Sequence, residues 1–383
     1  MRIETLLKKL ITFPTISEDQ AANRQAITWI KGELRHLPLH VREHRYEGYP
    51  SLVVTTRKTT SPTLWLQAHL DVVPGSPRVF MPKVSGRKIY GRGTFDMKFA
   101  IATYMELCMD LGKALSAYDF GIMLTTDEEI GGRNGVRALL FEEGYHGKVC
   151  FLPDGGSDWK MEQSAKGVLR MSVRSRGKSA HGARPWLGYD ANAELTRYLA
   201  ALQREFAKFD RGNPLHPEPT LTVGILRGGE VINQVPERAE AKLDIRYPQY
   251  YPRERIMALL KRVKPKDSRL AIRTLSHSSG YHTDVSGTYH RMYADIVKDV
   301  RGRRPGAIDA HGSSDARHFV NAGIPTILIR PRGGGQHSES EWIDLPDLDT
   351  YYHALRTFVQ QVAKPDTGRY PAKPGTGRHL AKR

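Results

Sequence analysis

The sequence predicts an α/β fold in which a mostly parallel sheet, covered by helices, is interrupted by a ferredoxin-like insert. Three observations indicate this fold. With 383 residues, the chain exceeds the length that one hydrophobic core usually supports, so two domains are expected. Apolar segments of strand length alternate with segments of helical periodicity in the first part of the chain. Beyond residue 166 the expected order becomes β-α-β-β-α-β, the order of a split ferredoxin-like unit.

Helix and strand signals alternate in the first part of the chain. The second helix is predicted to begin at Ser17, because Gln20 three residues later completes a capping-box pattern. The helices expected here cover residues 2–11, 17–37, 97–112 and 134–143. The strands expected here cover residues 41–45, 52–56, 64–68, 120–125 and 148–153. This alternation favours a largely parallel sheet with helices on both faces.

The insert is expected to form one antiparallel sheet with helices on one side. Its strands are predicted at residues 169–176, 220–226, 239–247 and 269–276. Its helices are predicted at residues 188–207 and 253–263. Apolar and charged residues alternate along 239–247, which leaves one sheet face open to solvent or to a partner. A helix at 286–299, a strand at 326–330 and a helix at 347–363 then resume the first pattern.

These patterns divide the chain into three parts. The main domain, which carries the candidate site described below, is predicted to comprise residues 1–166 and 283–363. The insert is predicted to comprise residues 167–282. Residues 364–383 are basic and rich in Pro and Gly, so they are expected to form a disordered tail.

The chain is strongly basic, with a formal net charge of +17. A basic body can indicate nucleic-acid binding. Its basic residues, however, form no run, no stripe interleaved with aromatic residues and no recognisable nucleic-acid module. We therefore expect no nucleic-acid partner, and we interpret the charge as a general surface property or a response to acidic substrates.

Composition also bears on the cellular compartment. Only Cys108 and Cys150 occur, which gives no disulfide framework and suits a reducing environment. The N-terminal segment alternates charged and apolar residues and lacks the apolar stretch and cleavage site of a secretory signal. Apolar runs such as 120–124 are too short to cross a bilayer. These features predict a cytoplasmic protein with no membrane partner.

Histidine and carboxylate residues gather where the predicted strands end. His69 and Asp71 follow the strand at 64–68, while Glu128 and Glu129 follow the strand at 120–125. The remaining candidates follow glycine-rich loops or the later strands: Asp96, Asp154 and His337. The carboxyl edge of an open α/β sheet is where ligands bind. Each residue alone has a simpler explanation, such as a turn or a core histidine, so the hypothesis depends on their convergence.

This set of side chains predicts a two-metal site. Imidazole and carboxylate ligands suit Zn²⁺, and similar sites accept Mn²⁺ or Co²⁺. Two histidines with several acids are too many ligands for one tetrahedral ion, but they suit two ions that share a carboxylate. One ion would be held by His69 and Asp154, the other by Glu129 and His337, with Asp96 bridging them.

Two further carboxylates lie beside the expected ligands. Asp71 is placed to accept the second imidazole N–H of His69, which would fix its tautomer and raise its basicity. Glu128 is next to a ligand but is itself free. It is predicted to act as a general base that takes a proton from the water between the metals, whose pKa the ions lower.

Three motifs carry a resemblance to a known family: LQAHLDVVP at 66–74, YGRGTFDMK at 90–98 and TDEEIGG at 126–132. Together they resemble the di-zinc metallopeptidase and amidohydrolase family that includes acetylornithine deacetylase, succinyl-diaminopimelate desuccinylase, aminoacylase-1, carboxypeptidase G and carnosinase-type dipeptidases. The resemblance covers about residues 3–363. It implies a zinc-peptidase-like catalytic domain, the ligand set above, Glu128 as base, and a ferredoxin-like lid domain through which members commonly form homodimers.

The resemblance also suggests residues that contact the substrate. His181, in the sequence SAHG, is similar to the family histidine that stabilises the oxyanion, often across a dimer interface, although it could be a simple turn residue. Asn233 and Arg246 resemble contacts to a substrate carboxylate, although Arg246 could be only an exposed strand charge. Ser313 lies in a segment similar to the Gly-Thr-Ser-Asp loop that approaches the substrate.

Asp154 and the overall build of the chain point to different substrate classes. In this family, an aspartate at the position of Asp154 resembles the aminopeptidase and dipeptidase branches, whereas glutamate accompanies deacylases and carboxypeptidases. Chain length and the compact lid resemble the deacylases. The expected reaction is hydrolysis of an amide bond in a dipeptide, short peptide or N-acyl amino acid, and a biosynthetic deacylase is the alternative. A metal-free basic binding protein is a third hypothesis, which the intact ligand set disfavours.

Overall fold

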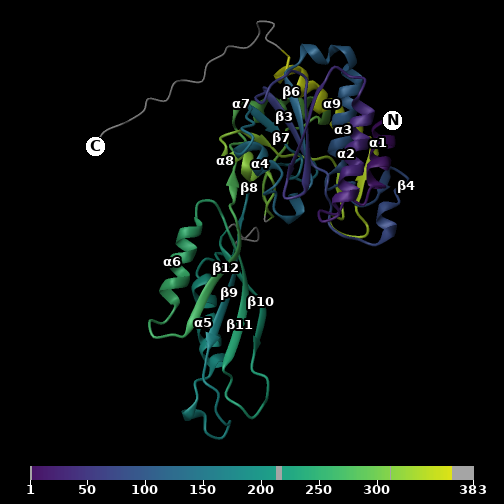
Figure 1. Cartoon of the computed structure of the whole chain (residues 1–383). Coiled ribbons are helices and arrows are strands. Elements are labelled where there is room, and N and C mark those ends of the chain that lie inside the picture. Colours follow the sequence, from purple (N-terminus) through teal and green to yellow (C-terminus); the bar gives the residue numbers. More distant parts are fainter. Residues whose placement is uncertain (1, 213–217, 311, 365–383) are drawn as a thin grey trace.

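A six-stranded sheet forms the centre of the computed structural model, which describes residues 2–212, 218–310 and 312–364 (Figure 1). The strand order is β1-β2-β6-β3-β7-β15. The strands are β1 (His40–Tyr46), β2 (Tyr49–Thr55), β3 (Leu64–His69), β6 (Phe120–Thr125), β7 (Val149–Phe151) and β15 (Thr326–Ile327). β6, β3, β7 and β15 run parallel, and β1 and β2 pair antiparallel at one edge. The predicted mostly parallel sheet is confirmed.

Helices cover both faces of this sheet. One face shares a hydrophobic core with α1 (Arg2–Ile11), α2 (Gln20–Leu34), α3 (Lys98–Leu111), α7 (Thr288–Arg301) and α9 (Leu345–Val362). The opposite face packs against α4 (Val136–Phe141) and α8 (Ala316–Asn321). Every residue of β6 is buried, because a strand covered on both faces has no solvent-facing side. This explains its continuous apolar run in the sequence.

The start of α2 differs from the prediction. Asp19, and not Ser17, caps the helix, and its Oδ1 accepts a hydrogen bond from Ala22 N at 2.9 Å. The capping-box pattern was misleading because aspartate is an equally good N-cap residue. The Ser17 hydroxyl instead donates to Asp71 Oδ2 at 2.7 Å, so this residue supports the candidate site.

Two smaller sheets complete the main part of the chain. One has the order β13-β8-β14 and contains β8 (Met161–Ala165), β13 (Tyr281–His282) and β14 (Ala307–Ala310). The other has the order β16-β17-β5-β4 and contains β4 (Lys83–Ser85), β5 (Lys88–Tyr90), β16 (Gly333–Gly334) and β17 (Trp342–Asp344). Pairing of β17 with β5 brings the loop that carries Asp96 beside the loop that carries His337.

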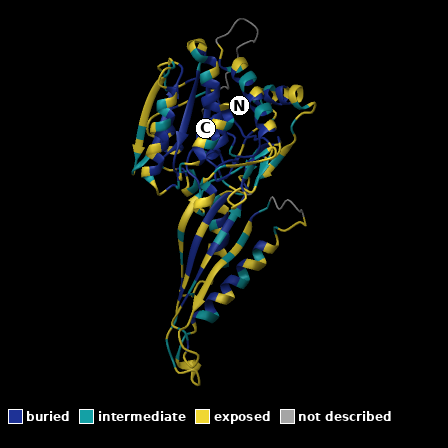
Figure 2. Cartoon of the chain, turned by 90° about the vertical axis from the view of Figure 1, so that its right-hand side faces the viewer, coloured by how far each residue is buried: buried dark blue, intermediate teal, exposed yellow. Residues whose placement is uncertain are grey.

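The insert forms a lid that extends away from the main sheet (Figure 1). Its elements are β9 (Gly167–Arg176), α5 (Ala191–Ala207), β10 (Thr220–Gly228), β11 (Arg238–Tyr247), α6 (Arg253–Val263) and β12 (Leu270–Ser278). The sheet order is β10-β11-β9-β12, and all its pairs are antiparallel. The predicted β-α-β-β-α-β order is therefore confirmed. Exposed residues predominate at the far end of the lid, whereas dark buried stripes run along its strands (Figure 2).

The lid has a hydrophobic core of its own. All the buried residues of this core come from residues 169–270, including Leu195 and Leu202 of α5 and Ile256 of α6. None of them belongs to the two cores of the main sheet. The predicted limits of the insert, 167 and 282, stay a prediction; Tyr281 pairs with Ala165 of β8.

Several predicted ends were inaccurate. The expected strand at 326–330 is only Thr326–Ile327, and the expected helix at 134–143 is only Val136–Phe141. The predicted disordered tail lies outside the described residues, apart from its first residue. Cys108 and Cys150 are both free and buried. Among the described residues, no helix has the length and apolarity needed to span a bilayer.

Candidate metal centre and active site

Neighbouring parallel strands deliver the candidate residues to one edge of the main sheet. His69 is the last residue of β3 and lies in register with Thr125, the last residue of β6. Glu128 and Glu129 form a short 3-10 helix after β6, and Asp154 follows β7 on the other side of β3. The carboxyl ends of parallel strands meet at this edge, which is the usual ligand-binding edge of an α/β sheet.

Five of the predicted residues form two clusters that share Asp96. His69 Nε2 lies 3.3 Å from Asp96 Oδ1 and 3.7 Å from Asp154 Oδ1. His337 Nε2 lies 3.0 Å from Asp96 Oδ2 and 3.2 Å from Glu129 Oε1. In each cluster, one potential ligand atom from each residue lies within 4.8 Å of the others. The structure thus brings together the residues of each proposed half-site, with Asp96 between them.

The spacing of these atoms fits metal ligation. Tetrahedral bonds of about 2 Å from one ion separate its ligand atoms by roughly 3.3 Å, close to the spacings observed. Within the described ranges, three of the buried polar atoms without a hydrogen-bond partner are His69 Nε2, Asp96 Oδ1 and Glu129 Oε1. Buried polar atoms normally have a partner. Their arrangement therefore fits two cations as the missing partners.

The electrostatics of the clusters lead to the same conclusion. The carboxylates of Asp96 and Glu129 beside its Nε2 raise the pKa of His337 to about 10. Burial opposes the protonation of His69, but Asp154 and Asp96 outweigh it and raise the pKa of this imidazole well above its usual value. Burial raises the pKa of Asp154 to about 6. Three carboxylates in one buried site favour positive charge, which divalent cations would supply.

Asp71 is close to His69 but acts differently from the prediction. His69 Nδ1 lies 2.9 Å from the backbone carbonyl oxygen of Asp71 and 3.6 Å from its carboxylate Oδ1. The carboxylate accepts hydrogen bonds from the backbone N–H groups of Glu128 (3.2 Å) and Glu129 (3.1 Å), and from Ser17. The carbonyl therefore orients the imidazole, and the carboxylate holds the segment that carries Glu128.

Glu128 lies beside the ligands without belonging to either cluster. In residues 2–212, 218–310 and 312–364, its carboxylate makes no hydrogen bond, although its backbone is fixed by Asp71. Burial and the neighbouring charge of Asp154 raise the pKa of Glu128 well above its usual value. A carboxylate with a raised pKa in such a position can accept and return a proton.

No sequence pattern indicated Glu341, which fixes the Asp96 loop. Its Oε1 accepts hydrogen bonds from the backbone N–H groups of Phe95 (2.8 Å) and Asp96 (3.0 Å). Its Oε2 accepts from Gly93 N (3.0 Å) and from the Arg92 guanidinium (3.1 Å). A glutamate beside a tryptophan in a short strand-like segment looks like a surface residue, so only the folded chain shows that it is buried.

Replacing Glu341 with alanine is expected to destabilise the protein by about 3–5 kcal/mol, because the buried Arg92 charge would be left unpaired. Urea unfolding followed by circular dichroism measures this change, and Zn²⁺ affinity should fall in parallel. Glu339→Ala is the matched control, since within the described ranges the hydrogen bonds of that exposed carboxylate are to Ser76 alone. It should change stability by less than about 0.5 kcal/mol. Equal stability of the two variants would contradict the positioning role of Glu341.

The predicted substrate-contacting residues of the lid lie apart from the metal clusters. His181 and Asn233 belong to two adjacent loops, joined by a bridge between His181 and Gln234 and by the Gly182 N–H donating to Asn233 O at 2.7 Å. β9 begins at Gly167, next to the main part of the chain, and ends at the far end of the lid. Both loops therefore lie at the end of the lid that is farthest from the main sheet (Figure 1). Within this one chain they do not join the site.

Arg246 and Ser313 lie nearer to the junction of the lid and the main part. Arg246 Nε donates to Asp244 Oδ1 at 2.6 Å. Ser313 Oγ lies 3.1 Å from Ser278 Oγ, and it accepts a hydrogen bond from Arg317 at 3.2 Å. Another nitrogen of Arg317 donates to the backbone oxygen of Gly131, so Ser313 is linked to the segment after Glu128.

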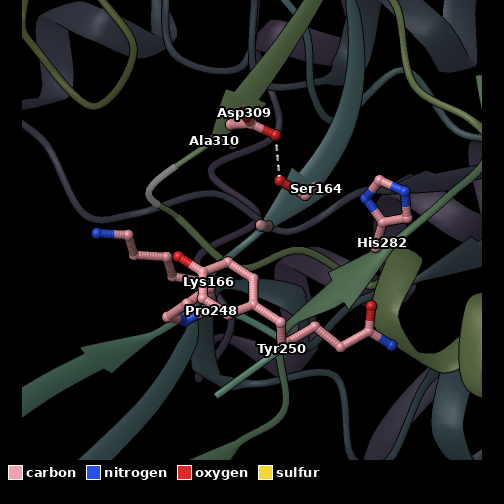
Figure 3. Close-up of a pocket in the computed structure, with 9 residues that line it drawn as sticks. Ser164, Lys166, Pro248, Tyr250, His282, Asp309 and Ala310 are labelled. Atoms are coloured by element: carbon pink, nitrogen blue, oxygen red, sulfur yellow. Dashed lines mark hydrogen bonds between the residues drawn. The ribbon is translucent and has the colours of Figure 1, made fainter. Parts of the chain in front are cut away.

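A cavity of about 680 Å³ also lies at this junction. Lys166, Pro248 and Tyr250 from the lid side face Ser164, His282, Asp309 and Ala310 of the small β13-β8-β14 sheet (Figure 3). The Ser164 hydroxyl donates to Asp309 across the cavity wall. None of the predicted metal ligands lines this cavity, so it is separate from the two clusters.

The candidate metal ligands are clustered at the carboxyl edge of an α/β sheet, and a free carboxylate lies beside them. This arrangement is typical of metal-dependent hydrolases. The sequence profile of Peptidase family M20/M25/M40 matches residues 65–361. The chain therefore belongs to this metallopeptidase family and is a hydrolase that acts on amide bonds. The family resemblance noted in the sequence is confirmed.

Individual relatives and solved structures agree with this assignment. Succinyl-diaminopimelate desuccinylase of Xanthomonas campestris pv. campestris strain B100 is 26% identical over 343 residues, which is 84% of this chain and 89% of the relative. Aminopeptidase PepT from Bacillus cereus has a TM-score of 0.77 at 19% identity, covering 94% and 98% of the two chains. Human carnosine dipeptidase 1 has a TM-score of 0.69 at 16% identity, covering 94% and 95%. These structures share the fold of this chain.

Proposed function

We propose that this chain is a two-metal enzyme that hydrolyses one amide bond in an N-acyl amino acid or a dipeptide. The observation that supports this most directly is the carboxylate of Asp96, which lies between two histidine–carboxylate pairs with Glu128 beside them. Zn²⁺ is the proposed metal because the donors are imidazole nitrogens and carboxylate oxygens, and Co²⁺ or Mn²⁺ could replace it.

Each residue has a proposed task in the reaction. His69 and Asp154 would hold one ion, His337 and Glu129 the other, and Asp96 both. Ions bound there would lower the pKa of water and polarise the substrate carbonyl. Glu128 would take a proton from the attacking water and pass it to the leaving amine. Asp71 would keep Glu128 in place through their backbone hydrogen bond.

His181 is proposed to stabilise the oxyanion of a second copy of the chain. Its loop lies far from the metal clusters of its own subunit, and exposed apolar residues surround it. Trp186 and Leu187 are 75% and 53% exposed, and Val231 in the adjacent loop is 54% exposed. Apolar side chains on a lid tip favour contact with another subunit. A homodimer through the lid would bring His181 to a neighbouring site, with Asn233 close by.

Two substrate classes stay open as proposals. The curated relatives named desuccinylases favour an N-acyl amino acid, with Arg246 and Ser313 as candidate contacts to its carboxylate. Asp154, an aspartate, favours a dipeptide. The alternative that the chain is an inactive basic binding protein is disfavoured, because all five proposed ligands are present and converge.

Removal of metal is expected to abolish hydrolysis, and two equivalents of Zn²⁺ per chain should restore it. The experiment measures turnover of N-acetyl and N-succinyl amino acids and of a dipeptide panel, before and after chelation with dipicolinate. Metal content by mass spectrometry is followed in parallel. A reconstituted protein that binds no metal and cleaves none of these compounds would refute the proposed function.

A further inference from the structure

None of the helices in the described part of the chain covers one face of the lid sheet. α5 and α6 pack with alternate residues of the strands, such as Leu243 and Ile245 of β11, into the lid core. The remaining residues of each strand point to the opposite face. Burial alternates along β11, whereas on β9 the opposite face also contains the buried residues Val168 and Ser172. We call the residues of β9–β12 on this side the open face.

The open face is strongly basic. Strand register and alternation place eight cationic side chains on it: Arg170, Arg174, Arg176, Arg227, Arg238, Lys242, Arg246 and Arg273. Only two acidic side chains share it, Glu240 and Asp244, which pair with Arg174, Arg170 and Arg246. Within the four described strands, the open face therefore carries a net charge of +6. Much of the basic excess of the chain is concentrated here.

Part of this arrangement does not help the sheet to fold. Arg238 and Arg176 are direct neighbours across the β11–β9 pair, and like charges placed opposite each other destabilise a sheet. Lys242 and Arg273 flank Ser172 in one row across three strands, and neither makes an ion pair in the part of the chain that the structure describes. Such unpaired charges create a positive field that attracts anions.

The open face leads directly to the candidate active site. Ser278, at the junction end of β12, contacts Ser313, which Arg317 links to the segment after Glu128. Arg246 of β11 and Ser278 of β12 both lie opposite Val168 of β9, so they share one row across the sheet. An anion held at this end of the open face would therefore lie near the segment that carries Glu128. The four strands present no aromatic side chain on this face, so it offers no surface on which nucleic-acid bases could stack.

We infer that the open face selects substrates that carry two or more negative charges, by concentrating them at the neighbouring active site. This inference rests on the proposed function and narrows its substrate class. It favours an N-acyl amino acid whose acyl group bears a second carboxylate over a zwitterionic dipeptide. The residues that determine this preference include Lys242 and Arg273, which contact none of the proposed metal ligands.

The test compares two substrates that differ in one charge: N-succinyl-L-alanine and its analogue with the succinyl carboxylate converted to an amide. Fields of this kind change association by about 10- to 1,000-fold. The double variant Lys242→Glu/Arg273→Glu should lower kcat/KM for the dianion by about 10-fold at low salt and for the amide by less than about 3-fold. kcat should not change, and 0.5 M NaCl should largely remove the difference.

A matched control carries the same charge change on the other side of the lid. Arg204→Glu/Lys261→Glu alters exposed residues at the ends of α5 and α6, and it should preserve the preference for the dianion. Arg238→Glu is a second test variant, which turns the repulsion from Arg176 into an attraction and breaks the ion pair with Glu237, so circular dichroism checks its folding. It should also reduce the preference.

Three results would overturn the inference. In the first, Lys242→Glu/Arg273→Glu and Arg238→Glu leave the ratio of kcat/KM for the dianion to kcat/KM for the amide unchanged. In the second, the control variant Arg204→Glu/Lys261→Glu lowers this ratio as much as the test variants do. The third is an unchanged ratio combined with weaker binding of a fluorescent RNA oligonucleotide, which would assign the face to nucleic acid. If the metal-loaded protein cleaves neither these two substrates nor any compound of the panel, the proposed function fails. Calorimetric affinities of the two compounds then test the charge preference by the same comparison.

Discussion

Glu128→Ala is expected to bind two metal ions and to lose turnover by about 100- to 10,000-fold, the range that general acid–base catalysis contributes. The reason is geometric: Glu128 belongs to neither metal cluster, yet its backbone is fixed beside Glu129 by Asp71. Steady-state kcat at saturating substrate measures the loss. Metal content by mass spectrometry shows whether the site itself survives.

The neighbouring residue provides the control for this experiment. Glu129 lies 3.2 Å from His337 Nε2 and belongs to the second cluster. Glu129→Ala should therefore lose affinity for one ion, and excess Zn²⁺ should partly restore its activity. If Glu128→Ala retained full turnover, Glu128 could not be the general base. If it lost metal, the two glutamates would have exchanged the roles proposed for them.

His181→Ala is expected to lower kcat by about 100- to 1,000-fold, the loss typical of removing one oxyanion donor. KM should change much less, because the interaction forms mainly in the transition state. The alanine variant should keep its metals and its thermal stability, since His181 is exposed and belongs to none of the three hydrophobic cores. The measurement is kcat and KM on the best substrate of the panel.

Subunit mixing tests whether His181 acts across a dimer. When His181→Ala and Glu128→Ala chains are refolded together in equal amounts, half of the symmetric dimers should be mixed. Each mixed dimer has one site with an intact Glu128 and a partner histidine, so about a quarter of the wild-type activity should return. If mixing restores nothing while mixed dimers are shown to form, His181 does not act in trans.

Sequence patterns predicted the sheet and the proximity of the candidate metal ligands because both depend on local order. A histidine or acid directly after an apolar strand must lie at the sheet edge, so His69, Glu129 and Asp154 could be placed together without coordinates. The order of the lid elements was equally local. Ser17 was misassigned because Ser17 and Asp19 are both good helix caps, and only the fold shows that Ser17 contacts Asp71.

Other parts of the site depend on contacts between distant segments. Glu341 reaches the Asp96 loop across 245 residues of sequence, and no spacing rule indicates such a contact. The acceptor for His69 Nδ1 depends on the path of the backbone, which brings the Asp71 carbonyl closer than its carboxylate. The basic open face emerges only when strand register places residues from four strands side by side.

The independent core of the lid has a consequence for how this protein was assembled. No buried residue of either core of the main sheet lies between 167 and 279. The chain leaves and re-enters the main part at adjacent points, where Gly167 and Gly280 pass so closely that a Cβ on Gly280 would lie 2.7 Å from Gly167 N. The lid therefore contributes no buried residue to the two main cores. A short turn that joined Ala165 to Tyr281 would leave both of these cores complete. A different insert at the same two points could redirect the same metal chemistry to other substrates.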